Sequence, residues 1–231
     1  MALYAIGDLH LSLGASKPMD IFAGWDGYVE KLKRGFARVA AEDTVILCGD
    51  LSWAMSLDDA REDFRFIDEL PGSKILLKGN HDYWFTTATK AQKIFAENGF
   101  NAMEILNNNA FAFNGAAIAG TRGWIYDENI DGTHNGKIMA REALRLEASL
   151  KAAEKLSPSE ILCFFHYPPR FANYVCEDIV ALMKRYGVRR CWYGHVHSFG
   201  HRHAVTGMVD GIEYNMISAD YVDFVPQIID I

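Results

Sequence analysis

Side chains that commonly bind metal ions follow five apolar runs of the sequence. They come directly after each run, and a glycine precedes them in four of the five cases. The candidates are Asp8, His10, Asp50, Asn80, His166, His195 and His197. Carboxylate, amide and imidazole groups in combination suit Zn, Mn or Fe, and a set without thiolates argues against a closed structural zinc site.

The number of candidates indicates two metal ions rather than one. Seven side chains are too many for a single ion but suit two ions that share one carboxylate. Asp50 is the natural bridge, because it lies in the sequence between the groups on either side. Ions about 3.5–4 Å apart can share a hydroxide and hold a phosphoryl oxygen. The residue types therefore predict metal-dependent attack on a phosphate ester.

The first part of the chain alternates between strand-like and helix-like segments. Strands are expected at 3–7, 44–48 and 74–77, and helices at 28–40, 58–70 and 87–98, with Asp58 as a candidate N-cap. This alternation predicts a parallel sheet with right-handed crossovers. Because the carboxyl ends of parallel strands line one crevice, the candidate ligands are expected to converge there.

The later part of the chain adds further strands and two hairpins. Turns are predicted at Asn114-Gly115 and Asp210-Gly211, helices at about 138–156 and 177–186, and strands at 161–165, 190–193 and 225–229. So many strands require two sheets packed face to face with helices outside, which is an α/β fold. No linker or repeat interrupts the chain, so we expect a single domain over residues 1–231.

The order of the polar blocks resembles that of the calcineurin-like metallophosphoesterase family. The blocks read Asp-x-His, Gly-Asp, Gly-Asn-His-Asp, His and Gly-His-x-His, and they span residues 8 to 197. The resemblance implies a four-layer αββα sandwich with two mixed sheets and a binuclear centre of divalent or trivalent Mn, Fe or Zn. It assigns Asp8, His10, Asp50 and His197 to the first metal, and Asp50, Asn80, His166 and His195 to the second. By the same resemblance, His81 matches the catalytic histidine and Asp82 its orienting acid.

A mechanism is expected from these assignments. A hydroxide that bridges the ions would attack phosphorus in line. His81 would protonate the departing alkoxide, an effect typically worth about 10²–10⁴-fold in rate. Asp82 would accept a hydrogen bond from His81 and fix its tautomer.

Two arginines are candidates for binding a substrate phosphate. Arg122 lies in a stretch without clear periodicity, residues 120–137, which predicts a binding loop. The equally supported alternative is a surface ion pair of Arg122 with Asp127 or Glu128. Arg170, close after His166, is the second candidate.

Several aromatic and histidine residues near these blocks remain open. Trp53, Trp84 and Trp124 could stack on a ring of the substrate, but packing is the favoured interpretation. His201 and His203 alternate as exposed strand residues would.

Composition narrows the class of protein. The chain has 231 residues, of which 50% are apolar and 23% charged, and its formal net charge is −7. These values predict a globular protein for which nucleic acid is an improbable partner. No apolar run is long enough for a membrane span, and the N-terminus lacks a signal-peptide pattern, so a cytoplasmic location is expected. The four scattered cysteines are expected to be buried and reduced.

The expected activity is hydrolysis of a phosphate monoester or diester in a small, nucleotide-like compound. A phosphoprotein Ser/Thr phosphatase is the alternative, because the family that the chain resembles includes both. A non-catalytic binding module is less consistent with the sequence, which retains the candidate ligands together with His81.

Overall fold

A computed structural model describes residues 1–126 and 131–231. Its first sheet has the strand order β13-β1-β2-β3-β4. The strands are β1 (Leu3–Ile6), β2 (Thr44–Cys48), β3 (Ser73–Leu77), β4 (Met103–Ile105) and β13 (Gln227–Ile229). The first four are parallel to one another, and β13 pairs antiparallel with β1. The carboxyl ends of β1 to β4 therefore lie at one edge of this sheet.

The second sheet has the order β11-β12-β10-β7-β6-β5. Its strands are β5 (Phe111–Phe113), β6 (Ala116–Thr121), β7 (Glu160–Phe165), β10 (Arg190–Tyr193), β11 (Gly207–Val209) and β12 (Ile212–Met216). The two predicted hairpins form its antiparallel edges, and the four central strands are parallel. Two short strands, β8 (Arg170–Phe171) and β9 (Tyr174–Val175), form a separate ribbon.

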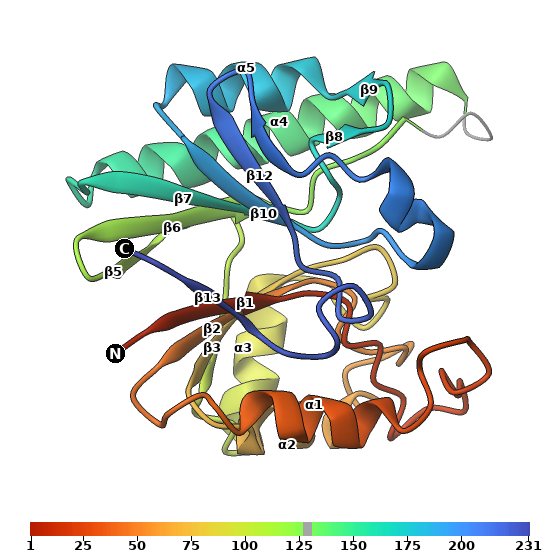
Figure 1. The fold of residues 1–231 in the computed structure, drawn as a ribbon. Helices are drawn as coiled ribbons and strands as arrows, with labels where there is room; N and C mark the ends of the chain where they lie inside the picture. Colours follow the sequence, from red (N-terminus) through yellow and green to blue (C-terminus); the bar gives the residue numbers. More distant parts are fainter. Residues whose placement is uncertain (127–130) are drawn as a thin grey trace.

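Helices cover the outer face of each sheet, as Figure 1 shows. The first sheet carries α1 (Tyr28–Phe36), α2 (Arg61–Glu69) and α3 (Ala88–Glu97), and the second carries α4 (Gly132–Glu154) and α5 (Glu177–Arg185). The predicted four-layer αββα sandwich with two mixed sheets is confirmed. Within the described part of the chain, no helix has both the length and the apolar composition needed to cross a membrane.

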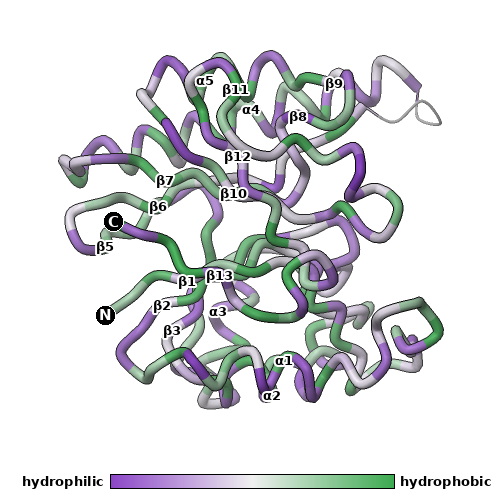
Figure 2. Tube along the Cα trace, in the orientation of Figure 1, coloured by the Kyte–Doolittle hydropathy of each residue, from purple (hydrophilic) through white to green (hydrophobic). Residues whose placement is uncertain are grey.

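Three apolar layers hold the sandwich together. One packs the first sheet on α1 to α3, a second packs the other sheet on α4 and α5, and a third lies between the sheets. The central strands are therefore buried on both faces, which explains their nearly continuous apolar sequences (Figure 2). Polar side chains are consequently displaced to the strand ends, where the candidate ligands stand. The four cysteines are free and buried, as predicted.

Some predicted boundaries were wrong. Helix α2 begins at Arg61, and the Asp58 carboxylate pairs with the Arg61 guanidinium at 2.7 Å instead of capping the helix. Residues 120–137 are not one loop, because β6 extends to Thr121 and α4 begins at Gly132. His201 and His203 lie in a 3₁₀ helix, η1 (Ser198–His203), and not in a strand.

Candidate metal centre

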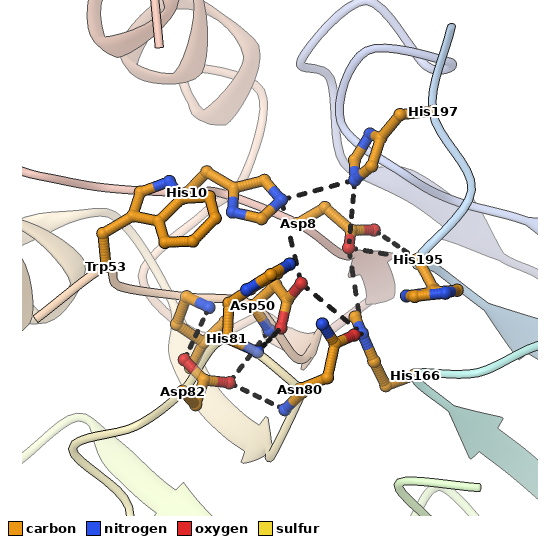
Figure 3. Close-up of polar contacts among 12 residues, drawn as sticks. Asp8, His10, Asp50, Trp53, Asn80, His81, Asp82, His166, His195 and His197 are labelled. Carbon is orange, nitrogen blue, oxygen red and sulfur yellow. Dashed lines mark hydrogen bonds and ion pairs between the residues drawn. The ribbon is translucent and has the colours of Figure 1, made fainter. Parts of the chain in front are cut away.

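The seven predicted ligands meet where the carboxyl ends of the two sheets face each other (Figure 3). They follow five different strands, β1, β2, β3, β7 and β10, of which three belong to the first sheet and two to the second. The ligands thus come from both sheets, although they range along the chain from Asp8 to His197.

One group of ligands consists of Asp8, His10 and His197. One ligand atom from each lies within 4.8 Å of the others. The Nε2 atoms of His10 and His197 are 3.3 Å apart, and His197 Nε2 is 3.6 Å from Asp8 Oδ1. The Asp8 carboxylate also accepts the backbone N–H of His195 at 2.9 Å, which fixes its orientation.

The second group consists of Asp50, His166 and His195, again with ligand atoms within 4.8 Å of one another. Asn80 joins it, because its Oδ1 lies 2.6 Å from His166 Nε2. Asp50 Oδ2 is 3.5 Å from His166 Nε2 and 3.8 Å from His10 Nε2. Asp50 therefore contacts both groups, as a shared carboxylate must.

The donor set of the second group fits a cation. His166 Nδ1 lies 3.0 Å from the carbonyl oxygen of Cys48, to which it donates, so Nε2 carries a lone pair. This lone pair faces the oxygens of Asn80 and Asp50. Burial and the nearby Asp82 and Asp8 carboxylates raise the pKa of Asp50 well above its ordinary value, so these three acceptors need a proton or a cation among them. Burial lowers the pKa of His166 to about 3, so near neutral pH its ring carries no second proton that could be donated to these oxygens. A bound cation would satisfy all three acceptors.

Two of the other three imidazoles have the neutral state that a metal ligand needs. Burial lowers the pKa of His195 to about 3 and places that of His10 well below its ordinary value, so both rings are neutral. His197 differs, because its hydrogen bonds with Asp220 and Asp8 outweigh burial and raise its pKa to about 10. A cation at the first group would take the place of that proton.

Unusual backbone conformations aim the ligands. Asp8, His10, Asp50 and His195 all have positive φ, between 46° and 71°. Such left-handed conformations cost roughly 1–2 kcal/mol per residue. Gly79 permits the closest approach, because a Cβ atom there would lie 2.1 Å from Asp50 Oδ1. The strand ends are therefore shaped to bring the ligands together at some cost in stability.

Asp82 has a different role from the one predicted. Its fully buried carboxylate accepts the backbone N–H groups of Asp50, Leu51 and Gly79 at 2.7–2.9 Å and the indole N–H of Trp84 at 2.8 Å. It is thus directed at the backbone of the ligand loops, and not at the His81 ring. The prediction that Asp82 orients His81 was wrong, because five N–H groups that need an acceptor surround the carboxylate, the fifth being the backbone N–H of Ser52 at 3.3 Å.

His81 stands at the edge of the ligand cluster and is half-buried. Its backbone N–H donates to Asp50 Oδ1 at 2.7 Å, and its Nδ1 lies 3.4 Å from Tyr83 Oη. Its ring centre is 4.3 Å from that of Trp53, which in turn stacks on His10 at 5.0 Å. Burial lowers the pKa of His81. Trp53 thus supports the rings of both a candidate ligand and the candidate acid.

Sequence reasoning missed Asp220, which follows β12. Its Oδ1 lies 2.8 Å from His197 Nδ1, so it holds His197 with Nε2 directed at the other ligands. Its second oxygen accepts the backbone N–H of Ser198 at 3.1 Å and lies 3.3 Å from His201 Nε2. The signal was available, because Ser218-Ala219-Asp220 follows the strand-like run after the predicted turn at Asp210-Gly211, as the other polar blocks follow their strands.

The two predicted substrate arginines lie in different surroundings. Arg170 donates to Asp210 at 2.6 Å and to Tyr214 Oη at 3.2 Å. Asp210 stands in the turn before β12, at the opposite end of the strand from the ligands, so Arg170 was wrongly assigned. Arg122 lies 3.5 Å from Glu142. The alternative pairing of Arg122 with Asp127 or Glu128 falls outside the described residues.

The remaining tryptophans are packing residues. Trp84 is buried against Phe64 and Phe85. Trp124 packs on Tyr167 and donates its indole N–H to Asn135 at 2.9 Å. The favoured interpretation of these two residues as packing agrees with the structure.

Solved structures of similar fold cover nearly the whole chain. A protein from Thermus thermophilus, TT1561, aligns with a TM-score of 0.57 and 16% identity over 99% of this chain and 97% of its own. A protein of unknown function from Aquifex aeolicus, AQ665, aligns with a TM-score of 0.53 and 18% identity over 98% and 95%. The phosphopantetheinyl hydrolase of Mycobacterium tuberculosis aligns with a TM-score of 0.54 and 14% identity over 99% and 95%. At these identities the likeness is one of fold.

Fold and site together define an α/β sandwich protein with two adjoining groups of candidate metal ligands at the carboxyl ends of its strands. The sequence profile of the calcineurin-like phosphoesterases matches residues 1–199, and the chain therefore belongs to that family. No curated protein matches the chain significantly.

Proposed function

We propose that this protein hydrolyses a phosphate monoester or diester of a small organic compound with the help of two transition metal ions. The observation that carries the proposal is Asp50, whose carboxylate lies 3.5 Å from one ligand group and 3.8 Å from the other. The first ion would be held by Asp8, His10, Asp50 and His197, and the second by Asp50, Asn80, His166 and His195. When bound, such ions stabilise negative charge on phosphoryl oxygens and lower the pKa of a water nucleophile.

The protein contributes orientation and a proton. Asp82 and the glycines before four of the five ligand segments hold the strand ends in place, so the ligand atoms are positioned before substrate arrives. We assign the proton donor for the leaving oxygen to His81. Its ring is half-buried beside Asp50, and Trp53 packs against it, so the imidazole faces the site on a firm support.

A small substrate is favoured by the name of one protein with a similar fold. A protein of the same fold is named as a phosphopantetheinyl hydrolase, which supports a substrate in which phosphate is joined to an organic group.

The test is hydrolysis of p-nitrophenyl phosphate and bis(p-nitrophenyl) phosphate after loading with Mn²⁺, Zn²⁺ or Fe²⁺. We expect turnover with at least one metal and none in chelator. His81→Ala should retain two metal ions per chain and lose about 10²–10⁴-fold in kcat. Asp50→Asn should lower the bound metal measured by elemental analysis.

Two results would contradict the proposal. Full activity of His81→Ala would exclude that residue as the proton donor, and unchanged metal content in Asp50→Asn would exclude the bridge. Preference for a phosphoserine peptide over both nitrophenyl esters would favour a protein phosphatase instead.

A further inference from the structure

A second polar cavity adjoins the candidate metal centre. It has a volume of about 230 Å³ and lies between the two sheets, at the carboxyl ends of β3, β4 and β6. We call it the basic pocket and define it by the charged residues Lys78, Arg122, Arg141, Glu142 and Arg145. The function proposed above makes no use of it.

The charge of the basic pocket is strongly positive, although the chain as a whole carries −7. Among the residues that the structure describes in its lining, four cations face a single carboxylate, Glu142, which is only 1% exposed. Glu142 accepts the hydroxyl of Thr121 at 2.8 Å and pairs with Arg145 at 2.7 Å, while Arg122 and Arg141 are 3.5 and 3.9 Å away. One carboxylate balances one cation, so most of the positive charge is left for another anion.

The contacts of Arg122 hold its guanidinium in place and do not use all of its hydrogen-bond donors. Its guanidinium lies over the rings of Trp124 and Tyr167, at 5.3 and 6.0 Å from their centres. Its buried Nε has no hydrogen-bond partner among the residues that the structure describes. Arg122 also lines the cavity, and its described contacts with two rings and one carboxylate leave part of the guanidinium available, a group that binds phosphate well.

Lys78 is positioned on the opposite wall. Its Nζ donates to the carbonyl oxygen of Phe85 at 3.2 Å and lies 5.2 Å from the centre of the Phe85 ring. An ammonium group has three donors, and this contact uses one. Burial lowers the pKa of Lys78, and the neighbouring Arg122 adds to this effect.

The pocket opens to solvent on the side of α4. The exposed fraction of the side chain rises from 16% at Arg122 to 40% at Arg145 and 54% at Arg141. Its volume is below the about 300–1,000 Å³ of pockets that enclose a whole drug-sized ligand. The dimensions suit one small anionic group that enters from outside.

The backbone places this pocket next to the metal ligands. Thr121 of β6 pairs with Phe165 of β7, so Arg122 and His166 follow neighbouring strands. The carbonyl oxygen of Arg122 accepts the backbone N–H groups of His166 and Tyr167. On the first sheet, Lys78 stands two positions before Asn80. Neighbouring strands are about 4.8 Å apart, so one small molecule can reach both sites.

We infer that the basic pocket binds a second phosphate group of the substrate while the metal centre holds the ester that is cleaved. The inference rests on the proposed function and specifies its substrate class, a small organic compound with a phosphate ester and a separate phosphate. Arg122, Arg145 and Lys78 supply the positive charge, and the ion pairs of Glu142 with Arg122 and Arg145 hold the two guanidinium groups beside the cavity. These residues are specificity determinants and take no part in the chemical step.

The number of phosphate sites tests the pocket directly. Equilibrium dialysis of the metal-loaded protein with radiolabelled inorganic phosphate should show two sites per chain, one at the metal centre and one in the pocket. Arg122→Gln and Arg145→Gln should each retain one site. The matched control is Arg185→Gln on α5, because this exposed arginine forms its ion pair with Glu147, outside the pocket, and should leave both sites intact.

Inhibition of p-nitrophenyl phosphate hydrolysis tests whether one molecule can occupy the metal centre and the basic pocket together. Alkanediol bisphosphates of increasing length are compared with alkyl monophosphates of the same length. We expect one length at which the bisphosphate inhibits at least about tenfold more strongly, because its second group binds at high effective concentration. In Arg122→Gln and Arg145→Gln the ratio of inhibition by the bisphosphate to inhibition by the monophosphate should fall to about one, whereas Arg185→Gln should keep the wild-type ratio.

The outcomes separate the pocket from the proposed function. Two phosphate sites in every variant would contradict the inference that the basic pocket binds phosphate. An active wild type that shows no preferred bisphosphate length would contradict it as well. A single wild-type site that disappears in Arg122→Gln would instead establish the pocket and overturn phosphate binding at the metal centre, and with it the proposed reaction.

Discussion

Asp220 shows how one residue beyond the predicted ligands can control the site. Its carboxylate lies 2.8 Å from His197 Nδ1 and so determines which ring nitrogen faces the metal centre. Partners of this kind also raise the basicity of a ligating imidazole. The contact joins the loop after β12 to the loop after β10, two strands that pair directly.

Replacing Asp220 with Asn should therefore weaken metal binding by about 10–100-fold, while the protein stays folded. The amide is neutral and can present its N–H₂ group to His197, which removes both the charge and the preference for one tautomer. Metal affinity would be measured by competition with a fluorescent chelator. Asp230→Asn, at an exposed position beyond β13, is the control, and equal affinities of the two variants would contradict the role of Asp220.

At the scale of the elements, the close contact between the loops after β2 and β3 is essential. A Cβ atom on Gly79 would lie 2.1 Å from Asp50 Oδ1 and 2.2 Å from Asp50 N. Gly79→Ala should displace Asp50, lower metal affinity and reduce the free energy of unfolding by about 1–3 kcal/mol, the usual cost of overpacking.

Gly136→Ala provides the matched control for this prediction. Gly136 lies in α4, and apart from the adjoining backbone of that helix no atom of the described residues stands within 4 Å of a Cβ placed there. Its replacement should leave metal binding unchanged and stabilise the helix by roughly 0.5–1 kcal/mol. Urea unfolding and metal titration of both variants would check the pair. Unaltered metal affinity in Gly79→Ala would show that Asp50 does not depend on this contact.

The end of α2 depends on a buried lysine of the neighbouring strand. Lys74 of β3 is 1% exposed, and its Nζ donates to the carbonyl oxygens of Asp68, at 3.0 Å, and of Leu70. Burial lowers the pKa of Lys74 to about 8. Between pH 8 and the ordinary lysine pKa, the unfolded chain therefore holds a proton that the folded chain has lost, so this group makes the protein more stable as pH rises.

We expect the free energy of unfolding of the wild type, relative to Lys74→Met, to increase from pH 7.5 to about pH 9.5 and to level off below pH 7.5. Comparison with the variant cancels the titration of all other groups. Urea unfolding at several pH values measures the difference. Lys93→Met, at a position where the side chain is 73% exposed, should show no such trend. Parallel pH profiles for wild type and Lys74→Met would refute the assigned pKa shift.

On the scale of the whole molecule, the metal centre lies where the two sheets meet at their carboxyl ends, beside the apolar layer that lies between them. Its ligands come from β1, β2 and β3 on one side and from β7 and β10 on the other. Bound ions would add a direct connection between them. We therefore expect metal to stabilise the entire fold and not only the loops that hold it.

The free energy of unfolding should rise with the logarithm of metal concentration, by about 4 kcal/mol at a thousandfold excess over Kd. Urea unfolding in chelator and at increasing Mn²⁺ would measure the effect. Asp50→Asn should show a clearly smaller increase, because it removes the ligand shared by both groups. A wild type that binds metal without any gain in stability would show that the unfolded chain binds it equally well.

The residue types and their order along the chain were enough to predict the class of fold and the convergence of the seven candidate ligands, with His81 beside them. This succeeded because buried parallel strands must be apolar and must end at a common edge, so polar residues after them stand out. Helix boundaries were less accurate, since α2 begins after Ala60 without a capping side chain, and the expected cap Asp58 pairs with Arg61 instead.

Only the tertiary structure decided which neighbours each side chain has. Asp82 follows His81 directly, yet its carboxylate binds the loop after β2. Asp220 and Arg170 stand at similar positions after strands, but one contacts a ligand and the other a distant turn. The four cations of the basic pocket come from the ends of β3 and β6 and from α4, which are far apart in the chain. The physical reason is that side-chain contacts depend on how the sheets stack and twist, whereas the periodicity of the sequence reports only which face of an element is buried.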